Sequence, residues 1–130
     1  MSDAEQLTVF DFVGGQPFFD ELVAAFYRRV ADDPPLLALY PDPTDLGPAR
    51  ERLALFLGQY WGGPTTYSEQ RGHPRLRMRH VPFVIGADER DRWLAAMTGA
   101  LDELAPPQLA RDRFDAYFAM SADAMMNQPD

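Results

Sequence analysis

The most informative segment of the chain is residues 60–80, which read YWGGPTTYSEQRGHPRLRMRH and precede a Val-Pro pair. Its Gly-Gly-Pro closes one helix, because glycine and proline commonly follow a helix C-terminus. Since proline disfavours the helical conformation in the residue before it, a short helix over residues 76–79 ends at about His80. The segment therefore predicts two helices joined by a long, poorly periodic connection over residues 65–74.

His80 falls where a helix leaves its last carbonyl groups without intrahelical partners. A neutral imidazole can donate one ring N–H to the carbonyl of Leu76, four residues back, which turns the other ring nitrogen outward as a Lewis base. Leu76 and Phe83 are apolar neighbours, so that nitrogen would emerge at an apolar surface. This geometry suits an axial metal ligand, although a lone histidine beside an apolar face is more often a cap or core residue.

Charge favours the ligand interpretation. Between Gln70 and Ala87 the chain has four arginines and two histidines but no carboxylate, whereas its formal net charge is -8. A basic patch on an acidic protein indicates an anionic partner at that position. A flat cofactor with an apolar face and an anionic edge, such as haem with its two propionates, would match this combination of apolar residues and arginine.

Composition limits the class of protein. With 130 residues, of which 46% are hydrophobic, the chain forms one domain that buries about two-thirds of its unfolded surface. We expect a single domain over residues 1–130, with residues 1–10 as a loosely ordered extension. No apolar run approaches membrane-spanning length and no signal-peptide pattern is present, so we expect a cytoplasmic protein. The absence of cysteine and lysine excludes thiolate ligands and lysine Schiff bases.

Hydrophobic residues recur at helical spacing along most of the chain, and no alternating strand pattern appears. The fold class is therefore all-α. Helices are expected over residues 17–31, 49–61, 88–104 and 108–127, with a short helical turn over 36–40. Asp88 is the expected N-cap of the third of these, with Asp91 completing a capping box. The last helix is expected to bury Leu109, Phe114, Tyr117, Phe118, Met120, Met125 and Met126.

Three polar aromatic residues each lie on the apolar face of a different helix or turn: Tyr27, Tyr40 and Trp93. If these faces converge on a cavity opposite His80, two phenol O–H groups and one indole N–H point at whatever the metal binds. Such donors stabilise a bound dioxygen or another anion-like ligand. The remaining polar aromatics near the helix ends, Tyr60, Trp61 and Tyr117, are interpreted as core or rim residues.

Over its whole length the chain resembles the group II truncated haemoglobins of the actinobacterial type. The residues that carry the resemblance are FVGG at 12–15, Phe26-Tyr27, Tyr40-Pro41, the run over 60–80 quoted above, and Trp93. The long run is highly specific, whereas a Gly-Gly pair alone would not be. The resemblance implies a globin-like, two-over-two helical sandwich around haem b.

The resemblance also implies roles for individual residues. His80 would be the proximal iron ligand, and the distal hydrogen-bonding cage would consist of Tyr27, Tyr40 and Trp93. Arg79 would pair with a propionate. Ala49 would stand where many globins carry a distal histidine, with Leu53 one turn further along. The remaining positions that line haem in such folds are Tyr67, Leu76, Met78 and Phe83.

These features lead us to expect a haem protein that binds O2, NO or CO at ferrous iron and releases O2 slowly. Slow release favours oxygen-dependent chemistry, such as conversion of NO to nitrate, or sensing, over bulk oxygen transport. Peroxidase-like activity is an alternative, in which His73 or the tyrosines supply protons or electrons. Turnover would need a reductase, and exposed aromatics such as Phe10 are consistent with a homodimer.

A second class of function is a cofactor-free helical module that docks an acidic partner through the arginine patch. It leaves the histidine at a helix end and the Tyr/Trp trio without a common purpose. Nucleic-acid binding is not expected, because the arginines outside the patch are interleaved with acidic residues, as in Glu89-Arg90-Asp91-Arg92.

Overall fold

The structure is a computed structural model that describes residues 8–72 and 85–126. All regular elements in these two ranges are helices, as the hydrophobic spacing predicts. In chain order they are α1 (Val9–Phe12), α2 (Gln16–Ala31), α3 (Pro34–Leu37), α4 (Gly47–Tyr60), α5 (Thr66–Arg71), α7 (Ala87–Leu104) and α8 (Gln108–Ala124). None of the described helices is long and apolar enough to span a membrane.

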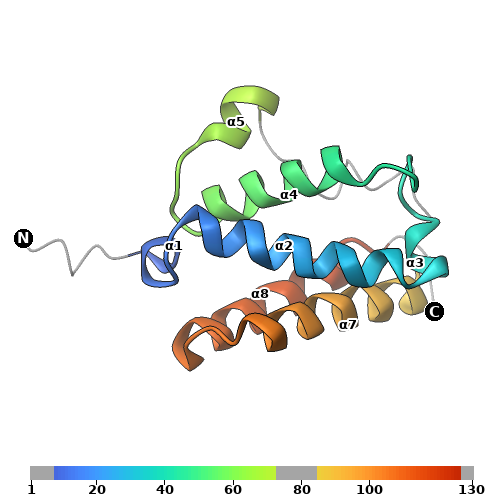
Figure 1. Ribbon diagram of the computed structural model, residues 1–130. Helices are drawn as coiled ribbons and strands as arrows, with labels where there is room; N and C mark the ends of the chain where they lie inside the picture. The colour runs from blue at the N-terminus through green and yellow to red at the C-terminus, as the bar shows by residue number, and fades with distance from the viewer. Residues whose placement is uncertain (1–7, 73–84, 127–130) are drawn as a thin grey trace, which may run out of the picture.

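Two antiparallel helix pairs form the body of the molecule (Figure 1). One pair is α2 with α4, and the other is α7 with α8. Helix α2 joins the pairs, because it packs against both α4 and α7. The buried core lies along α2, where Phe19, Leu22, Val23, Phe26 and Val30 are fully buried. The two pairs and the cross-contact of α2 give a two-on-two helical arrangement.

Two glycine pairs, Gly14-Gly15 and Gly62-Gly63, lie where α1 packs against the end of α4. The amide N–H of Phe10 donates to the carbonyl of Trp61 at 2.9 Å, and the Phe10 ring stacks on Phe19. A Cβ at Gly63 would lie 2.4 Å from the Phe10 ring, so only glycine fits there. Gly15, at φ 82°, forms the N-cap of α2. Helix α1 thus begins at Val9, within the ten residues that we expected to form a loose extension.

The bounds expected for the four long helices agree with the described ones to within a few residues, whereas the short turn expected over 36–40 lies at Pro34–Leu37. The short helix expected over residues 76–79 lies outside the described residues. The predicted cap of α7 was wrong. Gly86 is the N-cap, and its N–H donates to the Glu89 carboxylate at 2.8 Å, so the helix begins before Asp88. Sequence reasoning also missed α5, because it treated residues 65–74 as a connection.

Two residues that we expected to be buried on α8 are exposed. Leu109 and Met120 are 64% and 61% exposed, while Phe114 and Phe118 are buried. Leu109 and Met120 are eleven residues apart, which is about three helical turns, so they share one face. The buried face of α8 runs through Phe114 and Phe118 instead, and the expectation for Leu109 and Met120 was wrong.

Candidate functional site

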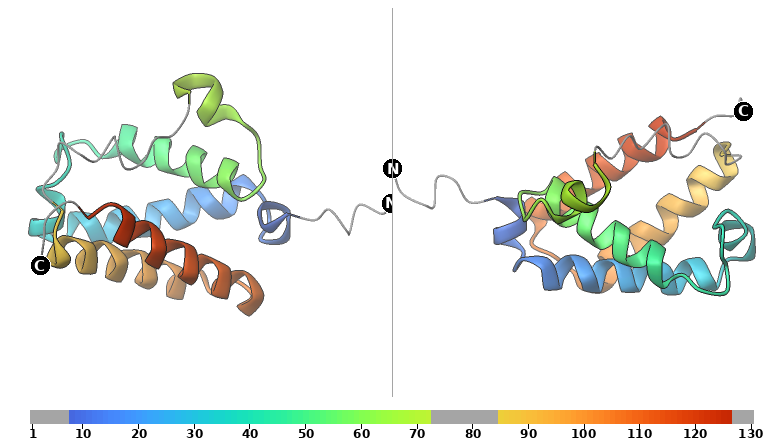
Figure 2. Two further views of the ribbon diagram at one scale, coloured as in Figure 1. Left: turned by 180° about the vertical axis from the view of Figure 1, so that it is seen from behind. Right: turned by 90° about the horizontal axis from the view of Figure 1, so that it is seen from above.

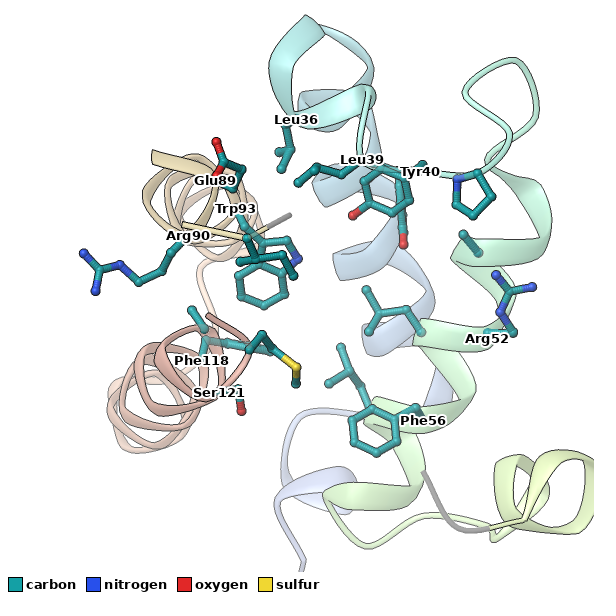
Figure 3. A pocket seen from close by; sticks show the side chains of 18 of the residues that line it. Leu36, Leu39, Tyr40, Arg52, Phe56, Glu89, Arg90, Trp93, Phe118 and Ser121 are labelled. Carbon is teal, nitrogen blue, oxygen red and sulfur yellow. The ribbon is translucent and has the colours of Figure 1, made fainter. Parts of the chain in front are cut away.

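A cavity of about 460 Å³ lies between the two helix pairs. Its volume is within the range that small-molecule and cofactor sites usually have. Every described helix except α1 contributes to its wall, and Figure 3 shows side chains from α3, α4, α7 and α8 around it. Figure 2 shows these helices from behind and from above.

Six of the predicted site residues lie together on the wall of this cavity: Tyr27, Tyr40, Ala49, Leu53, Tyr67 and Trp93. They come from α2, the turn after α3, α4, α5 and α7. Five others, Leu76, Met78, Arg79, His80 and Phe83, lie outside the described residues. Residues far apart in the sequence thus reach one cavity, which is the convergence that the Tyr/Trp pattern required.

The three polar aromatic residues form one hydrogen-bonded network on the cavity wall. Tyr40 is hydrogen-bonded to both Trp93 and Tyr27. An indole N–H can only donate, so Trp93 donates to the Tyr40 hydroxyl. Tyr40 and Tyr27 share the second bond, which raises the pKa of Tyr40 and lowers that of Tyr27. The two hydroxyls have two protons and one bond between them, so one phenol proton remains available to a third group.

Burial keeps both phenols protonated. Desolvation raises the pKa of Tyr27 to about 12, and the Tyr40 hydrogen bond and the charge of Arg52 offset only part of the rise. Desolvation also raises the pKa of Tyr40 well above its usual value. Both hydroxyls are therefore neutral donors across the physiological pH range. Ring contacts fix their positions, with Tyr27 and Tyr40 centroids 5.6 Å apart and Phe26 and Trp93 centroids 5.4 Å apart.

The opposite part of the wall comes from α8, which sequence reasoning did not assign to the site. Tyr117, Phe118, Ser121, Ala122 and Met125 all line the cavity. The Tyr117 hydroxyl is hydrogen-bonded to Ser121, one turn further along. Spacings of four and eight residues from Tyr117 to Ser121 and Met125 place these three on one helix face, and this spacing was the available signal.

Sequence reasoning identified only part of the face of α4 that lines the cavity. Ala49 and Leu53 were predicted to line the site, but Phe56 and Leu57 continue the same face and also line it. Arg52 lies on this helix at the cavity rim, where its charge acts on Tyr27. Other contributors that the sequence reasoning missed are Leu36, Leu39, Pro41, Arg71, Ile85, Glu89 and Arg90.

The lining is chemically suited to a haem group. Most of the wall is apolar, as a porphyrin face requires, and the cationic residues Arg52 and Arg71 are among the lining residues, which suits a cofactor that carries carboxylates. Arg90 also contributes to the wall, but its guanidinium donates to Asp123 and points away from the cavity (Figure 3). Hydrogen-bond donors are confined to a few positions, which is typical of cofactor pockets.

Comparison with known proteins agrees with this description. Residues 8–127 match the family model for bacterial-like globins. The solved structure of a thermostable haemoglobin from the actinobacterium Thermobifida fusca is 55% identical, with a TM-score of 0.92, covering 95% of this chain and all of that one. The group 2 truncated haemoglobin YjbI of Bacillus subtilis is 38% identical over 114 residues, which cover 88% of this chain and 85% of that protein.

A solved structure of a truncated oxygen-avid haemoglobin from Bacillus subtilis is 35% identical, with a TM-score of 0.87, and covers 93% of this chain and all of that one. These matches extend over both helix pairs and over the residues that line the cavity. The chain therefore belongs to the bacterial-like globins and, within them, to the group II truncated haemoglobins, a family of haem proteins with a two-on-two helical fold.

Proposed function

We propose that this protein holds haem b in the cavity and uses it to bind O2 with slow release. The observation that carries the proposal is the network from Trp93 through Tyr40 to Tyr27 on the cavity wall. It presents a phenol proton to a small ligand inside an otherwise apolar space. The oxygen-avid description of the Bacillus subtilis relative supports the same function.

When bound, haem would supply an iron atom at which a diatomic molecule such as O2, NO or CO can bind. On sequence grounds, we propose that His80 would ligate the iron and that Arg79 would pair with a propionate, and that Leu76, Met78 and Phe83 would contact the ring. Among the described residues, Leu53 and Tyr67 would contact the ring. Ala49 would leave space for a ligand to enter, since its side chain is small.

Hydrogen bonding accounts for slow release. A hydrogen bond to a partly negative oxygen contributes about 1.5 to 3 kcal/mol, and each 1.4 kcal/mol slows dissociation about tenfold. A protein that releases O2 so slowly is poorly suited to bulk transport. We therefore favour oxygen-dependent redox chemistry, with detoxification of NO as the leading reaction. Such turnover requires an electron donor, for which we propose a reductase partner.

The first test is the absorption spectrum of the purified protein beside His80→Gly. The wild type should show a Soret band that sharpens with dithionite and shifts again with O2, and the variant should lose this response. His73→Gly is the matched control, because it removes the other histidine of the chain. A wild type without a Soret band after addition of hemin would contradict the proposal and favour a cofactor-free binding module.

A further inference from the structure

The segment of residues 33–40 carries Tyr40 to the cavity wall and has little structure of its own. Its helix, α3, has four residues and one buried side chain, Leu36. A helix of this length is not stable by itself. Residues 41–45, which follow Tyr40, are all exposed, so the chain after Tyr40 has no buried residue to anchor it. The position of the Tyr40 hydroxyl therefore depends on contacts between this segment and other helices.

Helix α7 supplies two such contacts from consecutive residues. The Arg92 guanidinium donates to the Asp33 carboxylate at 3.0 Å, at the start of the segment. The Trp93 indole N–H donates to the Tyr40 hydroxyl at the end of the segment, and both of these residues line the cavity (Figure 3). Consecutive helical residues point about 100° apart, which allows Trp93 to face the cavity while Arg92 lies outside it. Helix α7 thus holds both ends of the segment.

The Arg92–Asp33 ion pair has a fixed geometry. Asp33 is the N-cap of α3, and the oxygen that accepts from Arg92, Oδ1, also accepts from the Leu36 backbone N–H at 3.3 Å. On the other side, the Arg92 Nε–H donates to the Asp88 carboxylate at 2.8 Å. An ion pair near the surface contributes little to stability. Because a second bond holds each partner here, the pair can still determine how α3 is oriented.

Backbone hydrogen bonds connect Asp33 to Tyr40. The Leu37 N–H donates to the Asp33 carbonyl at 2.8 Å, and the Tyr40 N–H donates to the Leu37 carbonyl at 3.1 Å. Between them, the Leu39 N–H donates to the Leu36 carbonyl at 3.1 Å. The segment is therefore a continuous series of hydrogen-bonded turns. A rotation of α3 about its capped end would displace the Tyr40 hydroxyl from the Trp93 indole.

We propose that Arg92 and Asp33 are positioning residues for ligand retention, because their ion pair holds the Tyr40 hydroxyl where it accepts from Trp93. The proposal rests on the proposed function, since it concerns the hydrogen bonds that retain O2 in the cavity. Neither side chain belongs to the described wall of the cavity, so each acts through Tyr40. Loss of the pair loosens the Trp93–Tyr40 bond and speeds the release of O2.

The experiment measures the O2 dissociation rate constant of the ferrous, haem-loaded protein by displacement with CO. Arg92→Gln should release O2 about two- to fivefold faster than the wild type, which is the size of effect that a partly exposed ion pair produces. Asp33→Asn should show the same change, since asparagine still caps α3 but carries no charge.

Arg111→Gln is the matched control. Like Arg92, Arg111 pairs with one carboxylate on its own helix, Asp115, and one on another helix, Asp102. It does not belong to the described cavity wall. Its loss should cost similar stability in thermal unfolding while leaving the O2 dissociation rate constant at the wild-type value.

A double substitution separates positioning from a general loss of stability. In the Tyr40→Phe background the hydroxyl is absent, so Arg92→Gln should add no further change to the O2 dissociation rate constant. The infrared stretching frequency of CO in the carbon monoxide complex reports the hydrogen bonds around the ligand. Arg92→Gln should shift this frequency toward that of Tyr40→Phe, whereas Arg111→Gln should not.

Salt provides a test that needs no substitution. Raising the ionic strength from about 0.01 M to about 1 M screens partly exposed charges. The O2 dissociation rate constant of the wild type should therefore rise toward that of Arg92→Gln, while that of the variant should stay constant. A wild-type rate constant that does not change with salt would contradict the positioning role.

The outcomes distinguish this role from the function on which it rests. A wild type without a Soret band, or a Tyr40→Phe variant that releases O2 at the wild-type rate, would overturn both. Faster release in Tyr40→Phe, together with wild-type release in Arg92→Gln and Asp33→Asn, would overturn the positioning role alone. The role is equally overturned if Arg92→Gln speeds release by the same factor in the Tyr40→Phe background, or if Arg111→Gln speeds it as much.

Discussion

The direction of the hydrogen bonds among Trp93, Tyr40 and Tyr27 decides which group faces a bound ligand. Trp93 donates to Tyr40, and Tyr40 shares one hydrogen bond with Tyr27, so one phenol proton of the pair is left for a ligand. The Trp93 N–H polarises the Tyr40 hydroxyl that accepts from it, because hydrogen bonds in a chain reinforce one another. We expect Tyr27 to provide the free proton and therefore to be a strong determinant of O2 retention on this wall.

Replacing Tyr27 with phenylalanine tests this assignment. Loss of one hydrogen bond to a partly negative acceptor should raise the O2 dissociation rate constant about ten- to a hundredfold, because such a bond contributes about 1.5 to 3 kcal/mol. The measurement is stopped-flow displacement of O2 by CO from the ferrous protein. Tyr60→Phe is the matched control, since Tyr60 does not line the cavity, and its rate constant should stay near that of the wild type. Equal O2 dissociation rate constants in the two variants would show that Tyr27 does not donate a hydrogen bond to the ligand.

The raised pKa of Tyr27 predicts how the free energy of unfolding depends on alkaline pH. The folded-state pKa of about 12 exceeds the ordinary value of 10.0, so the folded protein binds more protons than the unfolded one between these values. This contribution is fully present below pH 10 and is lost as pH rises through 12, and it amounts to about 3 kcal/mol. Urea titrations between pH 9 and 12 should show a decline that is smaller in Tyr27→Phe. A decline of equal size in both proteins would contradict the assigned pKa.

At the level of elements, one glutamine attaches α5 to α4. The Gln59 side-chain amide donates to the Ser68 hydroxyl at 2.7 Å, and its carbonyl accepts from the Ser68 backbone N–H at 3.0 Å. These bonds hold a helix of only six residues, which would be marginal by itself. They also place Tyr67 on the cavity wall, with its ring 5.5 Å from Phe56.

Gln59→Ala should therefore destabilise the protein more than loss of a surface hydrogen bond does. Two partly buried bonds are removed, which predicts a loss of about 1 to 3 kcal/mol in the free energy of unfolding. Gln108→Ala is the control, because Gln108 makes one exposed bond to Asp112 and should cost about 0.5 kcal/mol or less. Chemical denaturation of both variants measures the difference. Similar losses in the two variants would show that the hydrogen bonds between Gln59 and Ser68 contribute little to stability.

The close approach of α1 to the turn after α4 gives a prediction for Gly63. A Cβ there would lie 2.4 Å from the Phe10 ring and 2.8 Å from the Gly58 carbonyl oxygen, and the latter is backbone that cannot rotate away. Gly63→Ala should lower the free energy of unfolding by about 1 to 3 kcal/mol. Gly47→Ala is the control, since an added Cβ meets only the Asp45 carboxylate, at 3.0 Å. Thermal unfolding of the two variants distinguishes a steric cause from a general cost of replacing glycine.

The long helices could be predicted from sequence, while α5 could not. Helices α2, α4, α7 and α8 carry an apolar stripe over about four turns or more, which dominates any local preference. Helix α5 has a single buried residue, Tyr67, and depends on the Gln59 contact from nine residues earlier in the chain. The cap of α7 was missed for a related reason, because Gly86 has no side chain and the bond is made by Glu89 to its backbone.

At the scale of the whole molecule, the cavity is a large hollow in a small core. It lies between α2 and α4 on one side and α8 on the other, and its volume is about 460 Å³. The contribution of Tyr27, Tyr40 and Trp93 to its wall could be predicted. Each carries a polar atom on an apolar face, and such an atom needs a hydrogen-bond partner when it is buried. The α8 part could not, because Tyr117 and Ser121 look like ordinary core and surface positions until the helix pairs are placed together.

Removing haem should destabilise the protein strongly. A ligand that binds the folded state alone adds about 4 kcal/mol to the free energy of unfolding at a thousand times its dissociation constant. The melting temperature of the haem-free protein should rise with added hemin in a concentration-dependent way. Iron-free protoporphyrin IX should restore only part of the increase, because it would fill the apolar cavity but offer no iron to His80, the proposed ligand. A melting temperature insensitive to hemin would contradict haem as the cavity's occupant.

The two tryptophans lie where their fluorescence should depend on whether the cavity is occupied. Trp93 lines the cavity, and Trp61 contacts Tyr117, which lines it as well. Haem absorbs at the wavelengths where tryptophan emits, so both indoles would lose their excitation energy to a group in the cavity before emitting. The chain has no other tryptophan. The tryptophan fluorescence of the protein should therefore be weak when haem fills the cavity and strong when the cavity is empty. Its intensity then measures the fraction of molecules that hold the cofactor.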